Sequence, residues 1–363
     1  MSVSSHHVRV RSRILIGCLV VLALIGVAAP AGARVAPLGQ DPILAGRVYT
    51  GDFPDPSVLL VGNTYYAYGT TSDYLNIPEL TSGDLQTWSA HAATTASPRG
   101  DALPRAASWS AGVEDPDGTF HATTWAPSVT RLGPGRYVMA YATQTAGGPA
   151  QHMCLSVAFA RNPRGPFVDS STAPLVCPPH GAIDPQVFVA PNGRPWLLWK
   201  LDNMPPRLFT QPMTRDATAM LAGEPRRLLA RVAQSWEGRI IENPAMIRYR
   251  GRYYLFYSGN DFASSAYGVG YLVCTTWYSG CVRPLSRALL ASGGSIAGPG
   301  GGSPFVDRLG RLRLAYAAWT TGDVGYAANG HCRQTIDGCA QRRLYVATLR
   351  PDPTGLLHVV HRR

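Results

Sequence analysis

The chain has 363 residues, of which 45% are apolar and 15% charged, and its formal net charge is +11. This apolar share excludes a disordered chain, and the length is sufficient for one large core or two ordinary ones. Lysine occurs once, at Lys200, so nearly all basic residues are arginines, and they are spread singly along the chain. Since no basic run or nucleic-acid-binding motif is present, the charge indicates a solvated surface and no nucleic-acid partner.

The first 33 residues have the pattern of an export signal. Three arginines precede an apolar run at residues 14–29, and Ala31-Gly32-Ala33 follows it. A positive flank, an apolar stretch and a small-residue exit are typical of a secretory signal peptide. The run is shorter than the roughly 20 residues that span a bilayer. We therefore expect cleavage after Ala33, a secreted domain over residues 34–363, and no stable membrane insertion.

Six cysteines remain once that signal is removed, and an even number in an exported chain predicts disulfide bonds. Six cysteines allow 15 pairings. The short spacings favour the local set Cys154–Cys177, Cys274–Cys281 and Cys332–Cys339. The sequence has no C-x2-C pair and no histidine at zinc-finger spacing, so it predicts no zinc site.

A glycine followed six residues later by an aromatic residue occurs five times along the chain. The copies are Gly62…Tyr68, Gly135…Tyr141, Gly193…Trp199, Gly251…Tyr257 and Gly310…Tyr316. Each copy lies in an apolar strand, a glycine turn and a second strand, which is a hairpin signature. Five such units at near-constant spacing, without a long helical pattern, predict an all-β fold, a five-bladed β-propeller. The alternative is a β-sandwich with accidental similarity between the units.

Acidic residues stand at the head of three units, in Asp55-Pro56, Asp184-Pro185 and Glu242-Asn243-Pro244. The innermost strand of a propeller blade begins at the central channel, so these positions converge. Crowded carboxylates raise at least one pKa, and a protonated carboxyl beside an ionised one is what glycoside hydrolysis needs. As alternatives, each Asp-Pro is only a turn initiator, or the acids bind calcium, which no EF-hand-like loop supports.

The segments around these acids, residues 53–58, 124–129, 183–187 and 241–246, resemble glycoside hydrolase family 43. The resemblance implies a five-bladed propeller and an inverting enzyme for arabinans, xylans and related polymers. Carried over by position, Asp55 would be the general base and Glu242 the general acid, while Asp184 would tune and orient that acid. Trp125 would be a wall of the sugar site, with core packing as the alternative, and Phe53 a weaker case of the same role.

Many members of the resembled family carry a histidine near a GPG segment of the fifth blade, where this chain has glycines 298 and 300–302. We therefore expect no metal and no cofactor. The sequence predicts a secreted, monomeric glycosidase whose partner is a polysaccharide or oligosaccharide. Two alternatives stay open: a carbohydrate-binding propeller without catalysis, and a retaining furanosidase of the invertase type. In the invertase type, characteristic residues stand next to the three acids, and these residues are absent beside Asp55, Asp184 and Glu242.

Overall fold

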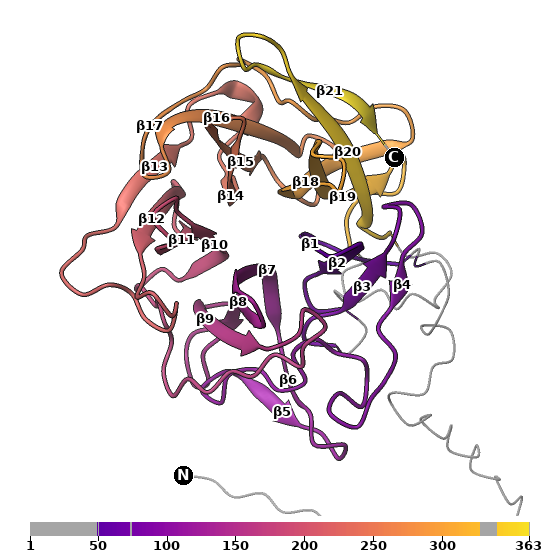
Figure 1. Cartoon of the computed structure of the whole chain (residues 1–363), viewed down its shortest axis with the longest axis vertical. Coiled ribbons are helices and arrows are strands. Elements are labelled where there is room, and N and C mark those ends of the chain that lie inside the picture. Colours follow the sequence, from indigo (N-terminus) through magenta and orange to yellow (C-terminus); the bar gives the residue numbers. More distant parts are fainter. Residues whose placement is uncertain (1–48, 50, 73–74, 327–339, 363) are drawn as a thin grey trace, which may run out of the picture. The chain divides into compact units, whose positions relative to one another are not determined.

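The computed structural model describes residues 49, 51–72, 75–326 and 340–362. These residues form antiparallel sheets that stand around a common centre (Figure 1). Five of the sheets are the blades of a β-propeller, which confirms the predicted all-β, five-bladed fold. The expected signal peptide, residues 1–33, lies outside the described residues.

In each blade the strands follow one another in chain order from the centre outwards. Blade 1 consists of β1 (Ser57–Val61), β2 (Thr64–Tyr68), β3 (Glu79–Ser82) and β4 (Ser89–Ala90). Blade 2 consists of β7 (Thr124–Gly133), β8 (Arg136–Gln144) and β9 (Met153–Ala160). The hairpin of β5 (Gly112–Glu114) and β6 (Phe120–Ala122) precedes blade 2 as a separate sheet.

The remaining three blades have four strands each. Blade 3 consists of β10 (Ala182–Val189), β11 (Pro195–Leu201), β12 (Arg207–Pro212) and β13 (Arg227–Arg231). A short 3-10 helix, η1 (Ser235–Glu237), leads to blade 4, with β14 (Ile241–Tyr249), β15 (Arg252–Gly259), β16 (Gly268–Thr276) and β17 (Ser279–Val282). Blade 5 consists of β18 (Ile296–Val306), β19 (Leu312–Thr320), β20 (Arg343–Pro351) and β21 (Leu357–Arg362).

The repeated glycine and aromatic residue have separate structural roles. The glycine lies in the turn that connects the first strand of each blade to the second. All five turn glycines have positive φ: Gly62, Gly135, Gly193, Gly251 and Gly310. Glycine adopts this conformation without the steric penalty of a Cβ atom. The aromatic residue lies on the second strand with at most 1% of its surface exposed, as Tyr68, Tyr141, Trp199, Tyr257 and Tyr316.

These aromatic residues fill the spaces between neighbouring blades. Trp199 packs with residues of blades 2 and 3, Tyr257 with blades 3 and 4, and Tyr316 with blades 4 and 5. Tyr68 and Tyr141 share the cluster between blades 1 and 2, and a further cluster joins blade 1 to blade 5. Each blade thus buries both faces against its neighbours. Apolar contacts, together with single hydrogen bonds such as that from the Gln186 side chain to the Met246 carbonyl, join neighbouring blades.

Two of the three predicted disulfides are confirmed. Cys154 on β9 is bonded to Cys177, and Cys274 on β16 is bonded to Cys281 on β17. The predicted Cys332–Cys339 bond lies outside the described residues. Within the described part of the chain, no helix is long and apolar enough to cross a bilayer.

Candidate active site at the propeller axis

The innermost strand of every blade carries a left-handed residue at its head. These residues are Asp55 (φ 52°), Ala126 (φ 44°), Asp184 (φ 57°), Asn243 (φ 53°) and Gly301 (φ 62°). In blades 2 to 5 the pairing with the next strand shifts at this point, which is a β-bulge. Aspartate, asparagine and glycine tolerate this conformation best. Asp55 thus lies in a bend and Asp184 at a β-bulge within β10, rather than in a regular turn.

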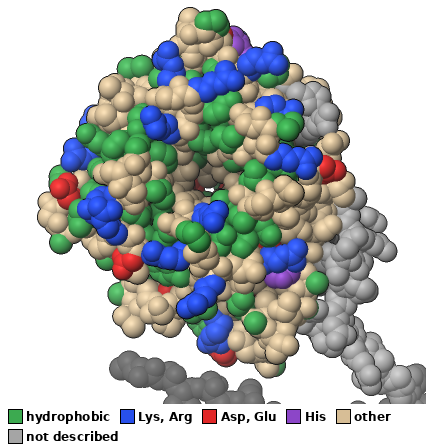
Figure 2. Space-filling model, viewed as in Figure 1, with side chains coloured by type: hydrophobic (Ala, Val, Ile, Leu, Met, Phe, Trp, Pro, Cys, Tyr) green, Lys and Arg blue, Asp and Glu red, His purple; other side chains and the backbone are tan. Residues whose placement is uncertain are grey.

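The innermost strands β1, β7, β10, β14 and β18 surround the centre of the ring, and each contacts its neighbours (Figure 1). The face seen in Figure 2 is hollowed at that centre, and Lys and Arg side chains are spread over it singly rather than in one patch. The side chain of Asp55 is 20% exposed and that of Glu242 is 14% exposed. Both carboxylates are therefore partly accessible to solvent.

Asp55 is held as a hydrogen-bond acceptor by two donors. The Thr70 hydroxyl donates to Oδ2 at 2.8 Å, and Nη1 of Arg342 lies 3.3 Å from Oδ1. Gly301 of blade 5 lies so close that a Cβ atom there would be 2.4 Å from Oδ1 of Asp55. The glycine that replaces an acidic head residue in blade 5 therefore makes room for the acid of blade 1.

Asp184 and Glu242 are neighbours in space across blades 3 and 4. The backbone N–H of Asn243, the residue after Glu242, donates to Oδ2 of Asp184 at 2.8 Å. Burial, followed by the repulsion of the Glu242 carboxylate, raises the pKa of Asp184 to about 8, although Lys200 acts in the opposite direction. Asp55 adds to the same repulsion. The three predicted carboxylates thus form one electrostatic cluster, in which burial and like charge raise the pKa of Asp184.

Glu242 has a charged partner and a hydroxyl partner. Nζ of Lys200, on β11, lies 3.1 Å from Oε2, and the Tyr267 hydroxyl donates to Oε1 at 2.7 Å. The ring of Tyr267 is only 2% exposed, and it occupies space that a Cβ atom at Gly300 would need. Both oxygens of Glu242 are therefore oriented by groups from other strands or loops.

Arg342 is a buried cation beside Asp55. It is 3% exposed, and its guanidinium lies 5.6 Å from the ring centres of both Phe262 and Tyr267. Among the described residues, its Nε and Nη2 atoms have no hydrogen-bond partner. Its backbone N–H donates to Asp52, whose carboxylate also accepts from the Tyr326 hydroxyl. Burial raises the pKa of Asp52 to about 6 against these hydrogen bonds.

The two predicted aromatic walls differ in position. Trp125 stands one residue before the left-handed Ala126, the position that Glu242 occupies in blade 4, and it is partly exposed while touching the core between blades 2 and 3. Phe53 has no exposed surface and packs in the cluster between blades 1 and 5, with its ring against Gly69. A sugar has no access to that ring, so the assignment of Phe53 to substrate binding is corrected to a core role.

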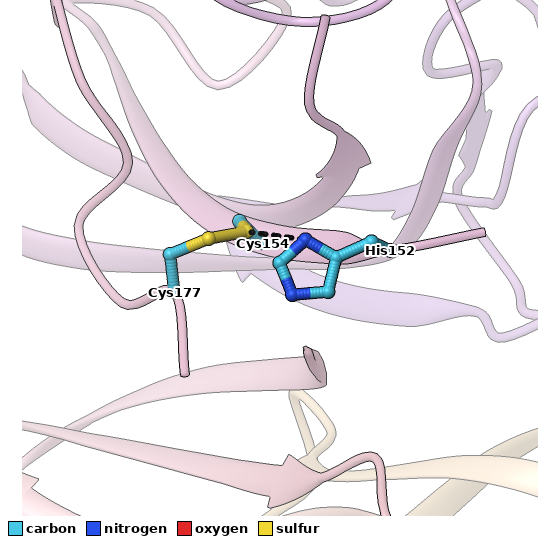
Figure 3. Close-up of side chains that lie close together, drawn as sticks. All are labelled: His152, Cys154 and Cys177. Atoms are coloured by element: carbon cyan, nitrogen blue, oxygen red, sulfur yellow. Dashed lines mark hydrogen bonds between the residues drawn. A yellow bond between two sulfur atoms is a disulfide. The ribbon is translucent and has the colours of Figure 1, made fainter. Parts of the chain in front are cut away.

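Potential metal ligands come together at one place among the described residues, and that place is away from the carboxylates. His152, Cys154 and Cys177 lie within 4.8 Å of one another (Figure 3), but the two sulfur atoms are joined in a disulfide. A disulfide sulfur is not the thiolate that a metal needs. In blade 5, the glycines at 298 and 300–302 provide no side-chain ligand.

Three residues of the cluster were not identified from the sequence. Lys200 had a signal, because it is the only lysine of the chain and ends an apolar strand. Arg342 is one of many arginines, and Tyr267 one of 17 tyrosines, so neither had a signal. Glu237, five residues before Glu242, is fully buried; it accepts a hydrogen bond from the Tyr257 hydroxyl and forms an ion pair with Arg283.

A five-bladed propeller whose axis holds accessible carboxylates and a third with a raised pKa defines the class of this protein as a glycosidase. A sequence match identifies the family. Residues 45–336 match the family described as Glycosyl hydrolases family 43, and the chain belongs to this family.

The relatives agree with this assignment. An extracellular endo-alpha-(1->5)-L-arabinanase of Thermotoga petrophila is 30% identical over 169 residues, which cover 40% of this chain and 33% of that protein. The match thus spans about a third of the relative's length. Among solved structures, a thermostable family-43 glycoside hydrolase has a TM-score of 0.68 at 24% identity, covering 88% of this chain and 95% of the other. An endo-1,4-beta-xylanase from Bacteroides thetaiotaomicron has a TM-score of 0.66 at 22% identity, covering 86% and 97%. These two structures share the fold.

Proposed function

We propose that the protein is a secreted, inverting glycosidase that hydrolyses arabinan or a related furanoside or xylan polymer, and that it acts as a monomer. In this proposal Asp55 is the general base, Glu242 the general acid, and Asp184 the group that tunes and orients the acid. The observation that carries the proposal is the cluster itself, in which two partly exposed carboxylates interact electrostatically with a third whose pKa is raised.

The reaction needs one ionised and one protonated carboxyl on opposite sides of the scissile bond. Asp55 fits the ionised role, because Thr70 and Arg342 both donate to it. The ionised carboxylate would take a proton from the attacking water as the oxygen of that water bonds to the anomeric carbon. Inversion leaves room for this water, so we expect the carboxyl groups of Asp55 and Glu242 to be roughly 6.5–9.5 Å apart.

Glu242 would give its proton to the leaving oxygen. The Asp184 carboxyl supports this role, because it lies beside Glu242 and the repulsion between the two carboxylates contributes to the raised pKa of Asp184. When that proton passes to the leaving group, both carboxylates are ionised, and the next turnover requires a proton from solvent.

The sugar class is inferred from the site and the relatives together. Trp125 is partly exposed at the head of blade 2, and an aromatic face there is suited to stacking on a sugar ring. The arabinanase relative and the family both support an arabinan or xylan polymer as the substrate. Secretion rests on the signal-like residues 1–33 and on the extracellular relative.

The test measures reducing sugar released from arabinan, arabinoxylan, xylan, galactan and arabinogalactan by the wild type, Glu242→Gln and Glu224→Gln. Glu224 is a surface residue with a 43% exposed side chain, so its variant is the matched control. We expect activity on one polymer in the wild type and the control, and a loss of at least about 100-fold in Glu242→Gln. Binding without turnover in all three proteins would instead identify a carbohydrate-binding propeller.

A further inference from the structure

Lys200 is unusual in this chain both by its identity and by its location. Arginine supplies every other basic side chain, yet the position that faces the catalytic cluster from β11 is a lysine. It is 6% exposed, whereas lysine is rarely buried unless it is paired. A role in surface solubility therefore does not explain a lysine at this position, whereas its contacts with carboxylates do.

The Lys200 ammonium lies among three carboxylates. It is 3.1 Å from Oε2 of Glu242 and 3.1 Å from Oδ1 of Asp202, and it interacts electrostatically with Asp184. Burial disfavours the charged ammonium, but the attraction of these carboxylates outweighs burial and raises the pKa of Lys200. The side chain therefore stays charged throughout the pH range in which a glycosidase works.

An ammonium group donates hydrogen bonds and cannot accept one. Oε2 of Glu242, which faces Lys200, is consequently held as an acceptor and does not carry a proton. The other oxygen, Oε1, faces the Tyr267 hydroxyl, which can either donate or accept. The proton of a protonated Glu242 therefore belongs on Oε1, and Tyr267 tolerates both charge states.

Lys200 also balances charge. Arg342 neutralises Asp55 on one side of the cluster, and Lys200 faces Asp184 and Glu242 on the other, with Asp202 at the solvent edge. Since one cation faces three carboxylates, negative charge is in excess there, which favours a proton on the Asp184–Glu242 pair. A compact ammonium suits this place better than a guanidinium, whose wide fork of donors would contact both oxygens of a carboxylate.

We propose that Lys200 is a positioning residue that directs the acid proton of Glu242 to Oε1 and limits the Asp184–Glu242 pair to one proton. This inference rests on the proposed function, in which Glu242 is the general acid. The single lysine of the chain thus has a role that depends on its compact charge.

The first experiment compares the pH profiles of kcat/KM for the wild type, Lys200→Met and Lys200→Arg on the polymer found above. Removal of the ammonium disfavours ionised carboxylates, so the pair keeps its proton to higher pH. We expect the basic limb to move upward by about one unit or more in Lys200→Met. In Lys200→Arg the limb stays in place, because the charge is kept, although kcat falls. A lower kcat in Lys200→Met with an unmoved basic limb would overturn the proposal, since a purely structural role predicts that result.

The second experiment needs no substrate. Because the chain has one lysine, protein labelled with 15N at the lysine Nζ gives one ammonium signal. We expect this signal to shift with pH as the neighbouring carboxyl pair titrates, and the shift to disappear or change midpoint in Glu242→Gln and Asp184→Asn. A signal that is insensitive to pH and to both variants overturns the inference. A sensitive signal in a protein that hydrolyses no polymer confirms the Lys200 contacts and contradicts the proposed function instead.

Discussion

Arg342 and Asp55 are 287 positions apart in the chain, and Nη1 of the arginine lies 3.3 Å from Oδ1 of the aspartate. The contact joins the segment before β20 of blade 5 to the head of blade 1, which is where the ring closes. The backbone takes part as well, since the N–H of Phe53 donates to the carbonyl of Arg342 at 2.8 Å. Closure of the propeller thus places a buried cation beside the proposed base.

Arg342→Met should reduce kcat/KM by about 100-fold, because it removes the cationic partner of Asp55. The adjacent Arg343 is exposed, so Arg343→Met is the matched control and should retain activity. Steady-state kinetics of both variants, with circular dichroism to check folding, measure the difference. Equal activities in the two variants would show that the Arg342–Asp55 contact has no role in turnover.

Gly301→Ala tests the close approach of blade 5 to Asp55. A Cβ atom at this position would lie 2.4 Å from Oδ1 and 3.0 Å from Cα of Asp55, so the base must shift. Gly62→Ala is the control, since Gly62 has a similar φ of 60° and no atom within 4 Å of its added Cβ. Both variants should lose about 1 kcal/mol of stability from the left-handed backbone. We expect turnover to fall at least about 10-fold only in Gly301→Ala, as measured by initial rates.

Asp184→Asn should change how stability depends on pH. The pKa of Asp184 is raised from its ordinary value to about 8 in the folded state, so the folded protein binds the proton more tightly than the unfolded chain. Its contribution to stability is complete below about pH 4 and is lost as the pH rises to 8. Asparagine does not titrate and still accepts from Asn243. As the pH rises from 4 to 9, denaturant unfolding should therefore show the free energy of unfolding of the variant increasing relative to that of the wild type.

Other buried acids do not alter the stability difference between Asp184→Asn and the wild type. Burial raises the pKa of Asp101 to about 7 and that of Asp52 to about 6, so both weaken the wild type in the same pH range. They are present in the variant too, and their effects cancel in the difference. A stability difference that is constant from pH 4 to 9 would contradict the raised pKa of Asp184.

The fold could be predicted because its determinants are local and repeated. A turn glycine and an interblade aromatic recur in every blade, for example as Gly62 and Tyr68, and the spacing alone counts the blades. The carboxylates could be predicted for the same reason, since Asp55 and Asp184 share one place in the repeat and Glu242 precedes it by one residue. Equivalent positions of different blades lie near the propeller axis, so acids that share a place in the repeat lie close together in the fold.

The partners of those carboxylates could not be predicted in this way. Lys200 approaches from the end of a second strand, and Arg342 from the segment before a third strand, so neither belongs to the register of the blade heads. Which of them faces the axis depends on side-chain packing between blades. Phe53 shows the converse error, because it stands two residues before Asp55 yet its side chain enters the core. Proximity in sequence to a proposed catalytic residue did not predict an exposed side chain.

The central claim is that Asp55 and Glu242 hydrolyse a glycosidic bond with inversion. Its most direct test is the 1H NMR spectrum of the sugar released in the first minutes of reaction, before the anomers equilibrate. We expect the first product to have the anomeric configuration opposite to that of the substrate linkage. We expect Asp55→Asn and Glu242→Gln to release no sugar. A first product that retains the configuration would contradict the central claim and would indicate a covalent intermediate.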